Sequence, residues 1–334
     1  MRVTTRPALL VATLSIMCPA LAGPTFTWER VADMPIGKGG QISGIVDGKV
    51  ILAGGTHWTD DTHKVWSAET YIYDPSADVW TEGPPVPFPV SYGAGQAIGR
   101  KLYVVSGSDG TRDYSLTMVL TKIGKKLHWV WGPAVPEPRI YPASVVIGSK
   151  LYVIGGAPDH DLKGKLYDDI LILDTARPEE GWRRSRGMPG TGRTLSAAAA
   201  IGDRIYVFGG YRQVRDGLEN SDDAFVYDTK ADRWTRLPDV PYAARAWDGL
   251  ALDGKAYILG GYVTWPRDLG RPDGFTDNIL RFDPVTNTYS DAGDLPLPNV
   301  SMNPRVLRDG RVFVAGGEDK MKHRTEVTAI GVLK

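Results

Sequence analysis

A pair of turn residues ending in glycine recurs along this chain at nearly even intervals, and this repeat constrains the fold more than any other feature. The pairs are Gly54-Gly55, Ser106-Gly107, Gly155-Gly156, Gly209-Gly210, Gly260-Gly261 and Gly316-Gly317. Their second residues follow one another at intervals of 49 to 56 residues. Each pair comes directly after a short apolar strand pattern. A repeat of this length is typical of a propeller, in which each unit forms one four-stranded blade. The sequence therefore predicts six blades.

The units repeat one internal order of strands and turns, which the segment around Gly209 illustrates. It contains a small and apolar strand over 194–201, a Gly202-Asp203 turn, a second strand over 204–208, a polar loop, a third strand over 224–227 and a fourth strand over 233–237. Trp234 is the centre of the fourth strand. Four other units have an aromatic residue at the same place: Trp80, Trp129, Trp182 and Tyr289. We expect these rings to pack between blades, where sheets stack face to face. The pattern is that of an all-β, six-bladed kelch β-propeller.

The last unit lacks a fourth strand, because only the segment from Arg324 to Val332 remains after Gly317 to form strands. At the other end of the chain, residues 26–30 followed by Met34-Pro35 have the aromatic and proline pattern of a fourth strand. We expect this N-terminal strand to complete the C-terminal blade and close the ring, which removes open sheet edges. Residues 23–334 are therefore predicted to form a single propeller domain.

The first 22 residues have the pattern of a secretory signal peptide. Arg2 and Arg6 precede an apolar stretch over 8–17, and the Ala-Leu-Ala sequence at 20–22 offers small residues for cleavage near Ala22. The sequence thus predicts an exported protein, and a periplasmic location rests on the family resemblance given below. Cys18 is the only cysteine and lies in this segment, so the mature domain is expected to contain no disulfide.

Charge and hydropathy exclude two classes of partner. Without residues 1–22 the chain has 37 basic and 39 acidic residues, a net charge of −2, so it lacks the basic surface of a nucleic-acid-binding protein. No apolar stretch outside the signal segment approaches the roughly 20 residues that cross a bilayer. Apart from His57 and His63, which lie six residues apart in one loop, the histidines fall in separate segments without the ligand spacing of a metal site, so no metal is predicted. The sequence leaves the choice between monomer and homodimer open.

Strand alternation places the loops after the glycine pairs on one face, together with the residues that precede each inner strand. These loops are long and varied, and they carry Trp58 and Trp265 as aromatic candidates for ligand contact. Arg139, Arg193 and Arg245 each stand nine residues before the glycine of an inner-strand turn. These arginines are candidates for binding a carboxylate. The alternative is that they tie neighbouring loops together by hydrogen bonds.

The sixth unit departs from the others directly after its glycine pair. Glu318 follows Gly317, and Arg324 stands six residues later. Both residues belong to the face with the long loops, where a carboxylate and a guanidinium are able to turn toward the propeller axis. The alternative interpretation is an ion pair between Glu318 and Arg324 that orders a short loop.

The sequence Gly317-Glu318, followed by Arg324-Thr325 and the acidic Glu326, resembles the catalytic segment of the bacterial N-acetylneuraminate epimerases. These proteins, also called sialic-acid mutarotases, are exported six-bladed kelch propellers. The resemblance spans the whole mature chain, and the Tyr92-Gly93 step is similar to that of the cyclically permuted members. It implies that Glu318 and Arg324 are the residues of catalysis and substrate binding.

The resemblance also implies a reaction. An isomerase of this family interconverts the anomers of N-acetylneuraminate, or of a related acidic sugar, through the open-chain ketone and without a cofactor. Glu318 would move the proton at the anomeric centre, and Arg324 would hold the substrate carboxylate. Further candidates for the carboxylate and for the apolar face of the sugar are Arg139, Arg193, Arg245, Tyr92, Trp58 and Trp265. The main alternative is a non-catalytic kelch propeller that binds a glycan or a protein.

Overall fold

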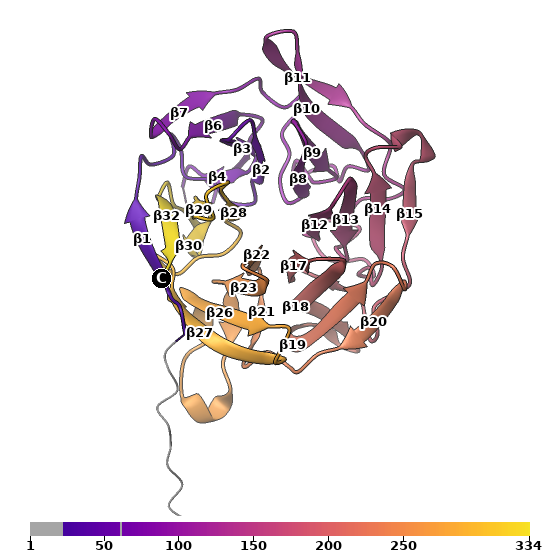
Figure 1. Ribbon diagram of the computed structural model, residues 1–334, viewed down its shortest axis with the longest axis vertical. Coiled ribbons are helices and arrows are strands. Elements are labelled where there is room, and N and C mark those ends of the chain that lie inside the picture. The colour runs from indigo at the N-terminus through magenta and orange to yellow at the C-terminus, as the bar shows by residue number, and fades with distance from the viewer. Residues whose placement is uncertain (1–22, 61) are drawn as a thin grey trace, which may run out of the picture.

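The structure, a computed structural model, describes residues 23–60 and 62–334, and in these residues the strands form five four-stranded sheets and one eight-stranded sheet. The sheets stand around a common centre as propeller blades do (Figure 1). Two 3-10 turns, η1 (Pro178–Glu180) and η2 (Arg267–Leu269), are the helical segments of the described chain. The predicted all-β, propeller-like architecture is therefore confirmed. No helix in this part of the chain has the length and apolarity needed to cross a membrane. The predicted signal segment and Cys18 lie outside the described residues.

The strand bounds are as follows. The four-stranded sheets contain β2 (Ile42–Val46), β3 (Lys49–Ala53), β6 (Thr70–Asp74) and β7 (Val79–Glu82); β8 (Ala94–Ile98), β9 (Lys101–Val105), β10 (Thr117–Ile123) and β11 (Lys126–Trp131); β12 (Ala143–Ile147), β13 (Lys150–Ile154), β14 (Ile170–Asp174) and β15 (Trp182–Arg184); β22 (Asp248–Leu252), β23 (Lys255–Leu259), β26 (Asn278–Asp283) and β27 (Thr288–Asp294); and β28 (Arg305–Val306), β29 (Val312–Ala315), β32 (Thr328–Leu333) and β1 (Phe26–Arg30). The eight-stranded sheet contains β16 (Arg193–Thr194), β17 (Ala197–Ile201), β18 (Arg204–Val214), β19 (Gly217–Asp228), β20 (Arg233–Arg236), β21 (Ala243–Arg245), β24 (Tyr262–Thr264) and β25 (Gly274–Phe275). Two short hairpins pair β4 (Thr56–Trp58) with β5 (Lys64–Trp66), and β30 (Glu318–Lys320) with β31 (His323–Arg324).

The hydrophobic core lies between neighbouring sheets. The second strand of a blade is covered on both faces, which is why β3 is a continuous apolar run with Val50 to Ala53 at most 2% exposed. On the outer strand β7, Trp80 packs on Tyr73 with 5.0 Å between ring centroids. Its indole nitrogen donates to the Ala32 carbonyl at 2.8 Å. The same kind of bond to a neighbouring backbone carbonyl is made by Trp129, Trp182, Trp234 and Tyr289. The prediction that these rings pack between blades is confirmed.

The eight-stranded sheet differs from the predicted four-stranded unit. Strands β18 and β19 continue past Gly209-Gly210 as a long hairpin, in which Arg212 pairs with Glu219 at 2.7 Å. The pairing of Ser221 with Ala244 then joins β19 to β21 and the strands that follow it. The polar loop predicted after Gly210 is therefore wrong, because cross-strand partners in this segment stabilise a sheet extension.

Both ends of the described chain meet in one sheet. Strand β1 pairs antiparallel with β32, from Phe26 opposite Leu333 to Arg30 opposite Ala329. Phe26 is buried and joins the hydrophobic cluster between this sheet and its neighbour. The segment 26–30 thus forms the outer strand beside the C-terminal strand (Figure 1).

A circuit of backbone hydrogen bonds surrounds the propeller axis. Within the described chain, each N–H of the circuit donates to the carbonyl of the next member, at 2.7 to 3.3 Å, and the last bond returns to the first residue. The members are Gly40, Ser301, Ala246, Leu195, Tyr141 and Tyr92, in the order in which each donates to the next. All six residues have a positive φ between 54° and 66°. Each precedes an inner strand, so this shared conformation turns the chain from the face with the long loops into the blade.

Candidate functional site

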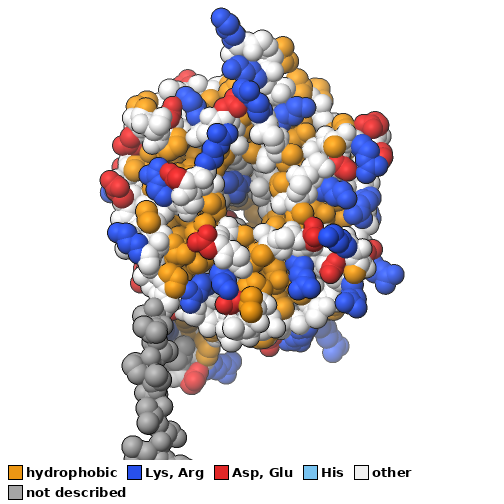
Figure 2. Space-filling view, viewed as in Figure 1, with side chains coloured by type: hydrophobic (Ala, Val, Ile, Leu, Met, Phe, Trp, Pro, Cys, Tyr) orange, Lys and Arg blue, Asp and Glu red, His pale blue; other side chains and the backbone are white. Residues whose placement is uncertain are grey.

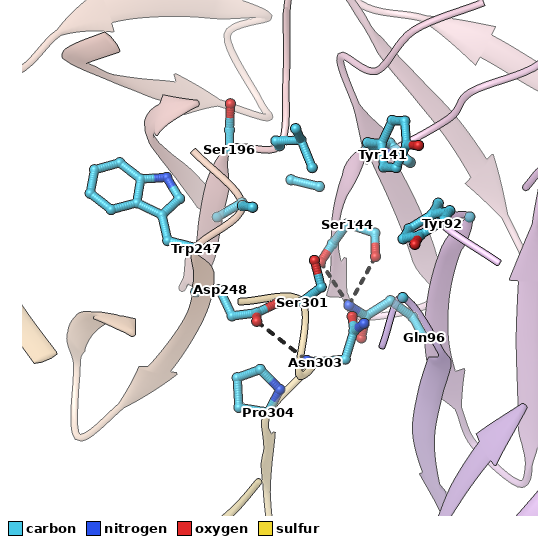
Figure 3. Close-up of a pocket in the computed structure, with 18 of the residues that line it drawn as sticks. Tyr92, Gln96, Tyr141, Ser144, Ser196, Trp247, Asp248, Ser301, Asn303 and Pro304 are labelled. Atoms are coloured by element: carbon cyan, nitrogen blue, oxygen red, sulfur yellow. Dashed lines mark hydrogen bonds between the residues drawn. The ribbon is translucent and has the colours of Figure 1, made fainter. Parts of the chain in front are cut away.

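The hydrogen-bond circuit forms the mouth of a cavity of about 90 Å³ on the propeller axis. Figure 2 shows a hollow at the centre of the molecule, with charged side chains of both signs distributed around it. Tyr92 and Tyr141 are the aromatic members of the circuit, and both line the cavity (Figure 3). The ring centroids of these two tyrosines are 4.7 Å apart. The aromatic side of the mouth therefore belongs to the blades that contain β8 and β12.

Polar side chains line the deeper wall of the cavity (Figure 3). The Gln96 amide donates to the Ser144 carbonyl at 2.7 Å. Asp248 accepts the backbone N–H groups of Met302 at 3.0 Å and Asn303 at 3.3 Å. Burial raises the pKa of Asp248 to about 6. This wall is a polar interior with a carboxyl group that is costly to ionise.

Glu318 and Arg324 meet across the β30–β31 hairpin, where they are register partners. The Glu318 carboxylate forms an ion pair with Nη1 of Arg324, and the arginine side chain is only 6% exposed. The other Glu318 oxygen accepts the Lys322 backbone N–H at 2.9 Å. The alternative from the sequence, an ion pair that orders a short loop, is thus the resting geometry.

Tyr92 is the second partner of the Arg324 guanidinium. Nη2 of Arg324 donates to the Tyr92 hydroxyl at 3.2 Å, and the same hydroxyl lies 3.0 Å from Thr56 Oγ1. Two glycines make room for this arrangement: a Cβ on Gly39 would lie 2.7 Å from Arg324 Cδ, and one on Gly40 would lie 2.2 Å from the Tyr92 ring. One guanidinium therefore holds a carboxylate and a phenol together beside the cavity mouth.

The charges around Tyr92 favour its ionised form. Burial by itself raises the pKa of the Tyr92 hydroxyl, but the positive charges of Arg324 and Lys64 outweigh burial and lower the pKa below its usual value. Burial likewise lowers the pKa of Arg324, and Tyr92 and Glu318 more than compensate, so that its pKa is raised. The site thus combines a permanent cation with a phenol that loses its proton more readily than an ordinary tyrosine.

Lys64 and Thr56 belong to this site, although the sequence analysis did not select them. Both lie on the β4–β5 hairpin, where Trp58 is the register partner of Lys64. The Lys64 ammonium lies 4.8 Å from the ring centroid of Tyr92 and 4.8 Å from that of Trp66. Trp58 is 6.0 Å from the same ammonium. Of the predicted aromatic contacts, the structure brings Tyr92 and Trp58 into the neighbourhood of Arg324.

Arg139 and Arg193 lie in buried ion pairs away from the cavity lining. Arg139 is fully buried and contacts Asp169 at 2.6 Å, and Arg193 is 1% exposed and contacts Asp223 at 2.5 Å. Lys38 makes the equivalent pair in the first blade. In each case the cation stands two residues before the circuit member; the acid directly precedes β14 or β6 in two blades, whereas Asp223 lies within β19. These arginines therefore fit the alternative interpretation, in which they connect neighbouring loops, because each guanidinium is already paired with an acidic side chain.

Arg245 and Trp265 lie in other surroundings. The Arg245 guanidinium stacks between Tyr211 and Tyr262, at 4.8 and 4.2 Å from their ring centroids. Trp265 packs against Tyr242, with 4.8 Å between centroids. Neither residue lines the axial cavity. The prediction that Arg245 occupies the same position in its blade as Arg139 and Arg193 is wrong by one residue.

The one-residue offset has its origin in the turn. The inner hairpin of the third blade turns through Gly148-Ser149, with glycine first, whereas the equivalent turn after β22 is Asp253-Gly254, with glycine second. Counting nine residues back from glycine therefore reaches different structural positions. The true equivalent of Arg139 and Arg193 in this blade is Ala244, two residues before Ala246 of the circuit.

Metal-binding clusters are not part of this site. In the residues that the structure describes, no group of three or more histidine, cysteine, aspartate or glutamate side chains is placed to hold a metal ion. The chemistry that the arrangement offers is proton transfer by Glu318 and Tyr92, with fixed positive charge from Arg324 and Lys64.

Comparison with known proteins gives one family and two kinds of relative. The model of the KLHDC2/KLHL20/DRC7 Kelch-repeats domain matches residues 94–317. The N-acetylneuraminate epimerase of Haemophilus influenzae (strain 86-028NP) is 27% identical over 192 residues, which are 49% of this chain and 51% of that protein. The N-acetylneuraminate epimerase of Pasteurella multocida is 26% identical over 191 residues, 48% of this chain and 50% of that protein. Kelch-like protein 35 of Mus musculus is 30% identical over 125 residues, 37% of this chain and 19% of that protein. The chain spans about half the length of the epimerases it matches.

Proposed function

Because this chain belongs to the family of KLHDC2/KLHL20/DRC7 kelch-repeats domains, whose scaffold by itself does not determine function, we propose its function from the site. We propose that the protein is a mutarotase, which interconverts the anomers of N-acetylneuraminate or of a related acidic sugar. The proposal takes the scaffold as six blades closed by β1. Its support is the pairing of β1 with β32 and the circuit of hydrogen bonds around the axis.

The observation that carries the proposal is the contact of one guanidinium with both Glu318 and Tyr92, of which Tyr92 lines the cavity. Interconversion of anomers requires removal of a proton from the anomeric hydroxyl and delivery of a proton to the ring oxygen. It then requires rotation of the open-chain ketone and closure from the other face. Glu318 is the proposed proton acceptor. The similarity to proteins named N-acetylneuraminate epimerase supports this substrate class.

Arg324 is the proposed anchor for the substrate carboxylate. A guanidinium has five N–H donors; Glu318 and Tyr92 engage Nη1 and Nη2 of Arg324, and its buried Nε has no hydrogen-bond partner among the described residues. Because Arg324 is held from both sides by Glu318 and Tyr92, it is positioned before the substrate arrives. Preorganised charge of this kind stabilises charge that develops during a reaction.

The experiment is proton NMR of freshly released α-N-acetylneuraminate, followed to its anomeric equilibrium with and without the protein. The wild-type protein should accelerate equilibration, and Glu318→Gln should lower the rate by at least about 100-fold, the usual worth of a general base. Glu326→Gln is the matched control, since this exposed glutamate lies close by in the chain. An unchanged rate in Glu318→Gln would contradict the assignment.

A second candidate function is binding without turnover, as in a non-catalytic kelch propeller. It is favoured by the resting ion pair, in which Glu318 and Arg324 satisfy each other. Saturation-transfer signals from the sugar, with no acceleration by the wild-type protein, would support binding and exclude the mutarotase.

A further inference from the structure

Tyr92 differs from the other members of the hydrogen-bond circuit in what surrounds its side chain. Its hydroxyl has Arg324 Nη2 at 3.2 Å and Thr56 Oγ1 at 3.0 Å, and the Lys64 ammonium lies over its ring. Tyr141 occupies the next circuit position, but its hydroxyl donates to the His160 carbonyl at 3.1 Å. Of the two aromatic members, only Tyr92 therefore has its hydroxyl beside two cations.

We propose that Tyr92 is a second catalytic residue, the acid that protonates the sugar ring oxygen while Glu318 takes the proton of the anomeric hydroxyl. This inference rests on the proposed mutarotase function. It assigns to Tyr92 a chemical step instead of a contact with the apolar face of the sugar.

The geometry of the guanidinium matches the geometry of the reaction. The ring oxygen and the anomeric hydroxyl are both bonded to the anomeric carbon, so the acid and the base must lie close together on one side of the sugar. Glu318 and Tyr92 bind Nη1 and Nη2 of the same arginine, and these two nitrogens are likewise bonded to one carbon. Arg324 therefore sets the spacing between the two groups that exchange protons with the substrate.

The proton balance closes without any co-reactant. Glu318 accepts the proton of the anomeric hydroxyl, the bond between the anomeric carbon and the ring oxygen breaks, and its electron pair stays with that oxygen. The ring oxygen takes the Tyr92 proton, which leaves a ketone, a free hydroxyl, a phenolate and a protonated Glu318. After rotation, the hydroxyl attacks the other face of the ketone, returns its proton to Tyr92, and the new anomeric oxygen takes the proton of Glu318.

Thr56 and Lys64 are positioning residues for the phenolate. In the resting site the Thr56 hydroxyl has two acceptors within reach, the Gly39 carbonyl at 3.3 Å and the Tyr92 oxygen at 3.0 Å, and either hydroxyl of the Thr56–Tyr92 pair can be the donor. When Tyr92 has lost its proton, the threonine hydrogen is able to turn toward the phenolate oxygen. Arg324 and Lys64 then supply opposite charge from two different hairpins.

The charged and titratable groups facing Tyr92 come from each element around it. Arg324 and Lys64 favour ionisation of the phenol, whereas Glu318 behind the guanidinium and Tyr141 on the neighbouring blade oppose it. The two cations prevail, because the pKa of Tyr92 is lowered in spite of its burial. The phenolate formed in the reaction is therefore better stabilised here than on an ordinary tyrosine.

The first part of the test compares the rate of anomerisation in Tyr92→Phe and in the control Tyr227→Phe, whose hydroxyl donates to Asp232 at 2.6 Å outside the cavity lining. Tyr92→Phe should lower kcat by at least about 100-fold with a much smaller change in KM, and Tyr227→Phe should retain the wild-type rate. Wild-type kcat in Tyr92→Phe overturns the catalytic assignment. If the wild-type protein does not accelerate anomerisation, the result contradicts the proposed mutarotase function and, with it, the catalytic role of Tyr92.

The second part measures the ionisation of Tyr92 directly, by the ultraviolet absorbance of tyrosinate during an alkaline titration. The wild-type protein should show a step worth one tyrosine at lower pH than the remaining tyrosines. This step should disappear in Tyr92→Phe, move to higher pH in Lys64→Met, and persist in Tyr227→Phe. A step that survives in Tyr92→Phe overturns the proposed stabilisation of the phenolate, whatever the activity of the protein.

Discussion

At the residue scale, the buried cations of this protein serve two different purposes. Arg193 is 1% exposed, and both of its terminal nitrogens bind Asp223, at 2.5 and 3.2 Å. Arg324 is nearly as buried, yet its terminal nitrogens are divided between a carboxylate and a phenol at the cavity mouth. A guanidinium that binds one acid holds two loops together, whereas the guanidinium that binds both Glu318 and Tyr92 is the one we propose to organise proton transfer.

Arg193→Met tests the structural assignment of this arginine. The change leaves the buried Asp223 without its main partner, and we expect the free energy of unfolding to fall by about 3 to 5 kcal/mol. The double variant Arg193→Met with Asp223→Leu should recover much of this loss, because it removes the unpaired charge. Urea denaturation measures both, with the more exposed Arg212→Met as a control expected to lose less than about 1 kcal/mol. Anomerisation per folded molecule should stay at the wild-type level; a rate loss would return Arg193 to the substrate site.

The contacts within the site could be predicted from sequence only where the residues are close in the chain; Tyr92 was selected as a candidate, but its contact with Arg324 was not predicted. Glu318 and Arg324 were found because six residues of hairpin bring them together. No sequence pattern indicated that Lys64 and Thr56 lie near Arg324, because this proximity depends on how segments far apart in the chain are arranged around the axis. Arg245 was misplaced because glycine changes its position within the inner turn from one blade to another.

At the element scale, the strands follow from apolar patterns and turn residues, and the exceptions have identifiable causes. The second strands and the outer aromatic strands were predicted well, because burial between sheets leaves continuous apolar runs and repeated tryptophans. The extension of β18 and β19 was missed. Its sequence is mostly polar and has no apolar alternation, and cross-strand pairs such as Arg212 with Glu219 hold it in the sheet.

Strand β1 is the element whose removal is most informative. Deleting residues 23–30 should destabilise the protein by several kcal/mol, because Phe26 and Trp28 leave a hydrophobic cluster and each buried large side chain contributes about 1.5 to 3 kcal/mol. It also exposes β32 as an open edge. The midpoint of urea unfolding measures the loss, with the exposed Thr27→Ala as a control expected to change little. An unchanged midpoint would show that β1 is dispensable for the fold.

At the scale of the whole molecule, two sets of carboxyl groups give stability opposite dependences on pH. Burial tends to raise the pKa of Asp169 and Asp223, but their paired arginines outweigh burial and lower it. These groups contribute stability above the pKa of the unfolded chain, and the contribution is lost as the pH falls through their lower native values. Asp248 behaves in the opposite way, since burial raises its pKa from the ordinary 3.8 to about 6.

Asp248→Asn tests this opposition. Between about pH 4 and pH 6 the native protein binds a proton at Asp248 that the unfolded chain has released, so the free energy of unfolding declines as the pH rises, by up to about 3 kcal/mol. Asparagine is never charged and still accepts the N–H groups of Met302 and Asn303, so the variant should be more stable than the wild type at neutral pH. The difference should vanish near pH 4. Thermal unfolding of the wild type and the variant across this pH range measures the difference in stability, with the exposed Asp216→Asn as a control. Equal stability of wild type and Asp248→Asn at neutral pH would contradict the prediction.

The hydrogen-bond circuit around the axis has no first and no last member. A linear ladder frays at its ends, where groups lack an ordered neighbour on one side. Here each of the six residues both donates its N–H and accepts at its carbonyl within the circuit, so none of them is released without breaking two of these bonds. We therefore expect the six amide hydrogens to exchange with water more slowly than those of the surface loops. We therefore expect the mouth of the site to be among the last parts of the protein to open locally.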